Sequence, residues 1–242
     1  MNMTRWLALI ACVLPATCLA ETVWVGRFAL TDAGLPAPWH VVQVDPDIPP
    51  TRYRLREWDG IAAVEAHAVK SMALLARPLD VDLIKTPVLC WRWRIDAPLK
   101  RADMTTRSGD DYAARVYLSF DVPPETLGVG TRLALKLARS LRGVDVPDAA
   151  INYIWDNRHP VGTWQANAYS DRARMRVQRT GAAHAGRWID ERRDVADDFR
   201  HAFGHAPVRL TGIAIASDTD NTGEEARAGF ADFRFVGKEA SC

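Results

Sequence analysis

Apolar and polar residues alternate along most of the chain after residue 20, a two-residue period that is typical of strands with one buried face. Clusters of Gly, Pro, Asp and Asn separate the alternating segments. This pattern predicts strands at Val23–Leu30, Trp39–Val44, Tyr53–Glu57, Ile61–Val69, Met72–Ala76, Val88–Ile95, Tyr112–Val122, Ile151–Trp155, Thr163–Tyr169, Arg174–Arg179, Arg187–Arg192, Leu210–Ser217 and Gly229–Val236.

Two segments repeat apolar residues at a helical step instead. Leucines recur every four residues in Thr131–Leu141, and Phe199 and Phe203 do the same in Val195–Phe203. Many short strands with one or two short helices predict an all-β fold. We expect a two-sheet antiparallel sandwich, jelly-roll-like and of the concanavalin or galactose-binding type, formed by residues 21–242 as a single domain.

The first twenty residues have the three parts of a secretory signal peptide. Arg5 gives a charged start, an apolar stretch runs from Trp6 to Leu14, and Cys18-Leu19-Ala20 ends the segment with small residues at the recognition positions. We therefore expect cleavage after Ala20 and a periplasmic or secreted protein. A membrane anchor is the alternative, but the stretch is shorter than the roughly 20 residues that cross a bilayer.

The cysteines leave two questions open. Cys12 ends a Leu9-Ile10-Ala11-Cys12 run that matches the pattern for lipid attachment, although few apolar residues precede it. After cleavage, Cys90 in a strand and Cys242 at the end of the chain remain. Outside the cytoplasm they could form a disulfide, or they could be a buried thiol and a free terminal one.

The charge balance narrows the class of partner. Removing Arg5 with the signal peptide lowers Lys+Arg from 31 to 30, which equals the 30 of Asp+Glu. A neutral chain without a basic block lacks the electrostatic footprint of a nucleic-acid binder. No later apolar run is long enough to span a membrane. The expected partner is a glycan or a small polar ligand.

Strand Val88–Ile95 has unusual faces. Its parity places Trp91 and Trp93 on one side and Arg92 and Arg94 on the other. We expect the tryptophans to be core residues, because large aromatic side chains cover the buried face of a sheet. The arginines remain open to a binding role.

The face opposite the apolar side of Tyr112–Val122 carries Asp111, Arg115 and Tyr117. A carboxylate, a guanidinium and a phenol on a concave wall could hydrogen-bond and stack on a sugar. The alternative is an ion pair between Asp111 and Arg115 on a solvated face.

Strand Leu210–Ser217 turns small residues away from the core, since Gly212, Ala214 and Ala216 share that face. Small side chains on a central strand suit a groove floor, or a loop that packs closely on the sheet. Candidate ligand contacts at the groove edge are Tyr153, Trp155, Trp164, Asn167 and Tyr169.

The turn Ser217–Gly223 is the most distinctive local feature. Asp218, Asp220 and Asn221 place three oxygen-bearing side chains within four residues, a set that could bind a hard cation such as calcium. The alternative is a turn whose side chains bond their own backbone. Asp110 and Asp111 form a second acidic corner that could lie close to it.

Motifs of known catalytic mechanism are absent from the sequence, including the nucleophile elbow, the zinc-protease helix and the phosphate-binding loop. Two carboxylates suffice for glycoside hydrolysis, and Asp111 with Asp218 or Glu191 are candidates. Solvated or structural carboxylates are the competing interpretation.

Several motifs together resemble a family of exported bacterial proteins, the domain of unknown function numbered three thousand and forty-seven. They are Gly109–Tyr117, Tyr153-Ile154-Trp155, Val161-Gly162-Thr163, Trp188, Glu191, Arg193-Asp194-Val195, Asp198-Phe199, Phe203-Gly204, Ser217–Gly223 and Phe230–Phe233. The resemblance runs from Trp91 onward and implies a β-sandwich outside the cytoplasm, with the acidic and aromatic positions acting as a unit. It assigns no catalytic residues.

These observations predict an exported, non-catalytic binding domain that recognises carbohydrate or another polar envelope ligand in a concave groove. Two alternatives remain: a polysaccharide-acting enzyme with paired carboxylates, and a structural or interaction protein of the cell envelope.

Overall fold

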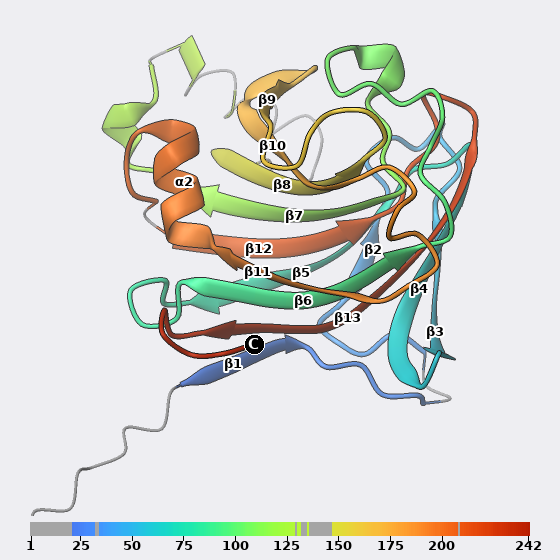
Figure 1. Cartoon of the computed structure of the whole chain (residues 1–242). Coiled ribbons are helices and arrows are strands. Elements are labelled where there is room, and N and C mark those ends of the chain that lie inside the picture. The colour runs from blue at the N-terminus through green and yellow to red at the C-terminus, as the bar shows by residue number, and fades with distance from the viewer. Residues whose placement is uncertain (1–20, 32–33, 129, 132–134, 136–146, 208) are drawn as a thin grey trace, which may run out of the picture.

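The computed structural model describes residues 21–31, 34–128, 130–131, 135, 147–207 and 209–242, and two β-sheets stack face to face within them (Figure 1). The predicted signal peptide at residues 1–20 lies outside the described residues. So does most of the helix predicted at Thr131–Leu141.

The first sheet has six strands. Their spatial order is β11 (Ile189–Asp194), β6 (Val88–Ile95), β13 (Glu225–Val236), β4 (Ile61–Val69) and β3 (Arg52–Trp58), with β1 (Thr22–Gly26) beside part of β13. The second sheet has seven strands, in the order β2 (His40–Val42), β5 (Leu74–Val81), β12 (Arg209–Ala216), β7 (Ala114–Asp121), β8 (Ala149–Asp156), β10 (Ser170–Thr180) and β9 (Trp164–Asn167). Two short 3-10 helices, η1 (Arg107–Gly109) and η2 (Pro124–Thr126), flank β7.

The predicted two-sheet sandwich is confirmed, and each predicted strand overlaps an observed one. One pairing differs from the antiparallel expectation, because β8 and β10 run parallel. The chain leaves β8, forms β9 at the edge of the sheet and returns as β10 between the two. Alternation alone cannot reveal this, since it reports the face of a residue and not its neighbouring strand.

Aromatic rings from both sheets fill the space between them. Trp91 of β6 stacks on Tyr153 of β8 with ring centres 5.4 Å apart, and the ring of Trp93 lies tilted against that of Trp155, with centres 5.6 Å apart. All four side chains are buried, so the prediction that Trp91 and Trp93 are core residues is confirmed. Their burial contributes much of the apolar area that stabilises the sandwich.

Helix α2 (Val195–Phe203) follows β11 and has the predicted bounds. The Asp194 carboxylate accepts a hydrogen bond from the Asp197 amide at 2.9 Å and caps the helix start. Gly204, in the left-handed conformation, ends it. Phe199 anchors the helix to Phe120 of β7, with ring centres 4.6 Å apart. Among the described residues, no helix is both long and apolar enough to cross a membrane.

Cys90 and Cys242 form a disulfide, with their Cα atoms 5.7 Å apart. Of the two possibilities that the sequence left open, the structure has the paired one. The bond joins residues 152 positions apart and fastens the last residue of the chain to β6.

Candidate functional site

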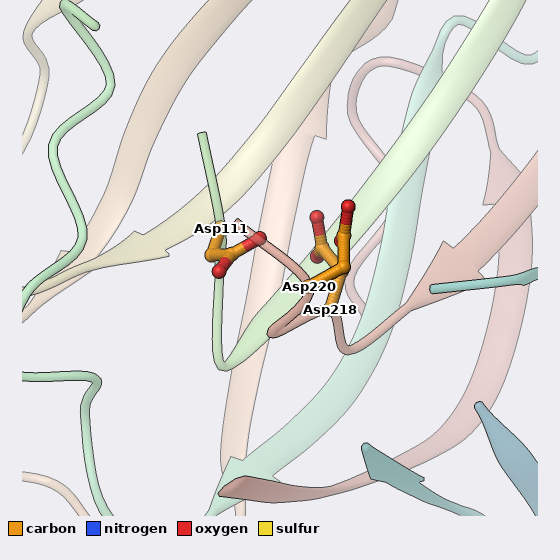
Figure 2. A group of neighbouring side chains, drawn as sticks. All are labelled: Asp111, Asp218 and Asp220. Carbon is orange, nitrogen blue, oxygen red and sulfur yellow. The ribbon is translucent and has the colours of Figure 1, made fainter. Parts of the chain in front are cut away.

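Two chain segments meet where β7 begins and β12 ends. The strands are antiparallel, with Arg115 opposite Ala216, so the residues before β7 and those after β12 lie at the same end of the seven-stranded sheet. Carboxylate oxygens of Asp111, Asp218 and Asp220 all lie within 4.8 Å of one another (Figure 2). We call these residues, together with Asp110, the acidic end.

Asp111 connects the two segments. Its Oδ1 accepts hydrogen bonds from the Asn221 backbone amide at 3.3 Å and from Asn221 Nδ2 at 3.1 Å. Its Oδ2 accepts one from the Thr222 amide at 2.6 Å. Asn221 therefore serves here as a donor to Asp111, and the three carboxylates that the structure brings together are those of Asp111, Asp218 and Asp220.

Asp218 is buried beside one cation. Its Oδ2 lies 3.2 Å from Arg115 Nη2, and both side chains are almost completely enclosed. Arg115 therefore pairs with Asp218 and not with Asp111, the alternative that the sequence had suggested. Asp218 Oδ1 is buried and has no hydrogen-bond partner among the described residues.

The local charge is unbalanced, because within the described part of the chain the four carboxylates of the acidic end are accompanied by one buried guanidinium, that of Arg115. Burial raises the pKa of Asp218 well above its ordinary range, and the neighbouring carboxylates of Asp111, Asp110 and Asp220 add to this rise, whereas Arg115 opposes it. Burial and the charge of Asp111 likewise raise the pKa of Asp220. Protons or a bound cation would relieve this repulsion.

Further oxygens in the same turn lack partners. Asp220 Oδ1 and Thr222 Oγ1 are buried and accept no hydrogen bond from the described residues. Calcium binds six to eight oxygens at about 2.4 Å, so opposite ligands are about 4.8 Å apart. The spacing and the oxygen-only donor set of Asp111, Asp218 and Asp220 fit such an ion.

A second layer of residues holds Asp110. Its carboxylate accepts hydrogen bonds from Tyr112 Oη at 2.8 Å and from Asn167 Nδ2 at 2.9 Å. Tyr169, which is exposed, donates to Asn221 Oδ1 at 3.2 Å. The predicted ligand contact Asn167 is thus joined to the acidic end through Asp110.

The outer face of the seven-stranded sheet begins beside the acidic end. Tyr117 of β7 is half-buried there, opposite Ala214 of β12 and Asn152 of β8. The charges of Arg115 and Arg172 act on its phenol and partly offset the rise in its pKa that burial causes. The Asn152 side-chain oxygen is buried and has no partner among the described residues. Asn152 and Ala214 are both buried, so Tyr117 is the partly exposed one of these three residues.

Two predicted ligand contacts lie elsewhere. Tyr153 and Trp155 are on the opposite face of β8, packed between the sheets. Because neighbouring residues of a strand point to opposite faces, they cannot share a surface with Asn152 or Tyr117.

A second buried network lies between β10, β11 and α2. Glu191 accepts hydrogen bonds from Trp93 Nε1 at 3.0 Å, from Arg179 Nε at 2.6 Å and from Gln178. Asp198 accepts one from Tyr153 Oη at 2.7 Å and a bidentate pair from Arg193. We call Arg174, Arg176, Gln178, Arg179, Glu191, Arg193 and Asp198 the arginine edge.

The arginine edge was not predicted as a unit from the sequence. A signal was present, because Arg174 and Arg176 occupy positions of β10 that share the inner face with Ile151 and Tyr153 of β8. Charged residues at inward-facing positions mark either a buried network or an opening in the core.

Fold and geometry together define a two-sheet β-sandwich protein with a buried carboxylate cluster at one end of the seven-stranded sheet. A family model described as "Protein of unknown function (DUF3047)" matches residues 37–234, and the chain belongs to this family. No curated protein matches the chain.

Proposed function

We propose that this protein is a non-catalytic binding domain that works outside the cytoplasm, holds a calcium ion at the acidic end and recognises carbohydrate on the adjacent outer face. One observation carries the proposal. Asp218 and Asp220 bury carboxylate oxygens that no described residue satisfies, next to Asp111 and with Arg115 as the one paired cation. Buried charge of one sign without partners calls for a counter-ion.

The burial also favours an ion over a substrate at this position. Catalysis by Asp111 and Asp218 would require a glycosidic oxygen within about 3 Å of a carboxyl group. Both side chains are enclosed, and Glu191, the other candidate, is held by three donors between the sheets. A single ion fits where a sugar ring does not.

Calcium would connect the two parts of the proposed site. It would fix the turn after β12 to the segment before β7, and Arg115 and Tyr117 begin the outer face directly beyond that junction. The carbohydrate would then meet Tyr117, whose phenol is partly exposed on this face. The disulfide suits an oxidising compartment outside the cytoplasm.

The cation part is tested by thermal melting in calcium and in chelator. We expect calcium at a hundred times its Kd to stabilise the wild type by about 2.7 kcal/mol. Asp220→Asn should lose most of this gain while keeping the Arg115–Asp218 pair. Asp190→Asn, an exposed carboxylate of β11, is the matched control and should respond like the wild type. Superimposed wild-type melting curves with and without calcium would refute the cation site.

The ligand part is tested on a panel of oligosaccharides, with binding and released sugar ends measured together. We expect binding without release, weakened several-fold in Tyr117→Phe through loss of one hydrogen bond. Trp24→Phe, an exposed aromatic on β1, should bind as the wild type does. Release of reducing ends would favour the enzyme, and no binding across the panel would favour an envelope protein without a glycan ligand.

A further inference from the structure

Arg174 and Arg176, two residues of the arginine edge, lie beside Phe203 of α2 and Trp164 of β9, and we call this partly exposed place the opening. Arg174 and Arg176 lie in register with Ile151 and Tyr153 of β8, so their side chains share the face that looks toward α2 and the six-stranded sheet. Arg174 is half-buried, and the Arg176 side chain is 12% exposed. The place is therefore reachable from outside and lies on the opposite face of the sheet from Tyr117.

The arginines of β10 lose their acidic partners toward the opening. From the core outward along β10, Arg179 pairs with Glu191 at 2.6 Å and Arg176 lies 4.0 Å from Asp198. Arg174 has no acidic partner among the described residues. The Nε atoms of Arg174 and Arg176 are buried and find no acceptor there. An anion at this position would supply the missing acceptor.

Aromatic rings border the same opening. Trp164 of β9 is half-buried and lies opposite Arg176, whose guanidinium is 5.9 Å from the indole centre. The His201 ring of α2 also lies beside the indole, with ring centres 5.1 Å apart, and the Phe203 ring centre lies 5.9 Å from the Arg174 guanidinium. Trp164 and Arg174 occupy diagonal positions on the neighbouring strands β9 and β10, and the backbones of such positions are about 7–8 Å apart. That separation suits one sugar ring with its acid group.

We propose that this opening is a second binding site, one that takes an acidic sugar residue of an oligosaccharide. Arg174 pairs with the sugar carboxylate, Arg176 adds a second positive charge beside it, and the sugar ring packs against the partly exposed Trp164 indole. Arginine suits this role because its planar fork matches a carboxylate. The site shares no residue with the acidic end and works without the calcium ion.

The test uses trigalacturonic acid as the probe, with its methyl ester and inorganic sulfate as comparisons, in calcium-free buffer. Tryptophan fluorescence and calorimetry measure binding to the full mature chain. We expect the acid to bind at least tenfold more tightly than the ester and than sulfate, because only the acid offers both a carboxylate and a ring.

Three variants locate the site. Arg174→Gln should weaken binding about tenfold by removing the charged donor. Trp164→Ala should weaken it several-fold and reduce the fluorescence change. Arg52→Gln, an exposed arginine of β3 in the other sheet, is the matched control and should bind as the wild type does. Thermal melts of all three variants establish that they are folded.

The outcomes separate this site from the proposed calcium site. Asp220→Asn should bind trigalacturonic acid as tightly as the wild type does. Binding of the acid is therefore expected whether or not the protein binds calcium. Equal affinity of the wild type for the acid and for its ester would overturn the inference. So would equal affinity for the acid and sulfate, which would indicate a simple anion site, or unchanged binding in folded Arg174→Gln.

Discussion

The acidic end and the arginine edge both bury carboxylates, but they satisfy them differently. At the arginine edge Glu191 and Asp198 each accept hydrogen bonds from several donors, among them Arg179 and Arg193. At the acidic end, Asp218 has one arginine and an oxygen without a partner among the described residues. Each carboxylate of the arginine edge is therefore paired with an arginine, whereas among the described residues the buried carboxylates of the acidic end have one buried arginine, Arg115.

This difference separates a structural network from a candidate site. A fully partnered buried carboxylate stabilises the fold only as long as its partners remain, because removing one leaves the other charge unpaired. A carboxylate without partners costs free energy until a ligand arrives. The same reasoning with the sign reversed applies to Arg174, the arginine that Glu191 and Asp198 do not neutralise.

The largest effect is expected when the complete network is broken. Glu191→Ala leaves Arg179, Gln178 and Trp93 without their acceptor and should lower the free energy of unfolding by about 3 kcal/mol. Urea denaturation measures this change. Asp190→Ala, the neighbouring exposed carboxylate of β11, is the control and should cost less than about 1 kcal/mol. Equal effects of the two substitutions would show that the network adds nothing to stability.

A second change tests whether calcium acts locally. Cys242→Ser opens a loop of 152 residues and should lower the free energy of unfolding by about 2–4 kcal/mol. Since Cys90 lies in the six-stranded sheet, away from the acidic end, the gain from calcium should equal that of the wild type. Denaturation of both proteins with and without calcium measures it. Loss of the calcium gain in Cys242→Ser would contradict the separation of the two regions.

The smallest expected effect is the pH dependence of the free energy of unfolding, to which Asp218 and Glu65 contribute with opposite signs. The folded-state pKa of Asp218 is raised, mainly by burial, so the folded protein binds more protons than the unfolded chain above about pH 4. The free energy of unfolding without calcium should therefore fall as the pH rises through this window. Glu65 behaves oppositely: although burial opposes the change, Arg56 and Arg54 lower its pKa, and its contribution is lost as the pH falls.

Urea denaturation between pH 4 and 7 in calcium-depleted buffer measures this dependence. Asp218→Asn should flatten the decrease, because the amide does not titrate. Calcium should reverse the decrease, since protons and the metal compete for the same carboxylates. An unchanged slope in Asp218→Asn would assign the dependence to other groups.

Much of the fold could be predicted from the sequence, because alternation reports directly which residues are buried. Val116 and Leu118 of β7 and Ile213 and Ile215 of β12 face the core as their parity predicted. The interposition of β10 between β8 and β9 could not be predicted, since strand order depends on tertiary pairing.

The candidate site was only partly predictable. The turn chemistry identified Asp218 and Asp220, but the approach of Asp111 depends on the register of β7 against β12. Tyr153 and Trp155 were predicted as ligand contacts because they are aromatic, but they lie in the core. Parity shows which residues share a face of β8 and does not show which face lies between the sheets. Burial of an isolated strand's two faces is set by what packs on each.

The central claim is that the acidic end binds a divalent cation, and equilibrium dialysis of the mature protein against radioactive calcium tests it most directly. We predict one calcium ion per chain in the wild type and in Asp190→Asn, with the affinity strongly reduced in Asp220→Asn. A wild-type protein that is folded and binds no calcium, or an Asp220→Asn protein that binds it as tightly as the wild type, would contradict the account.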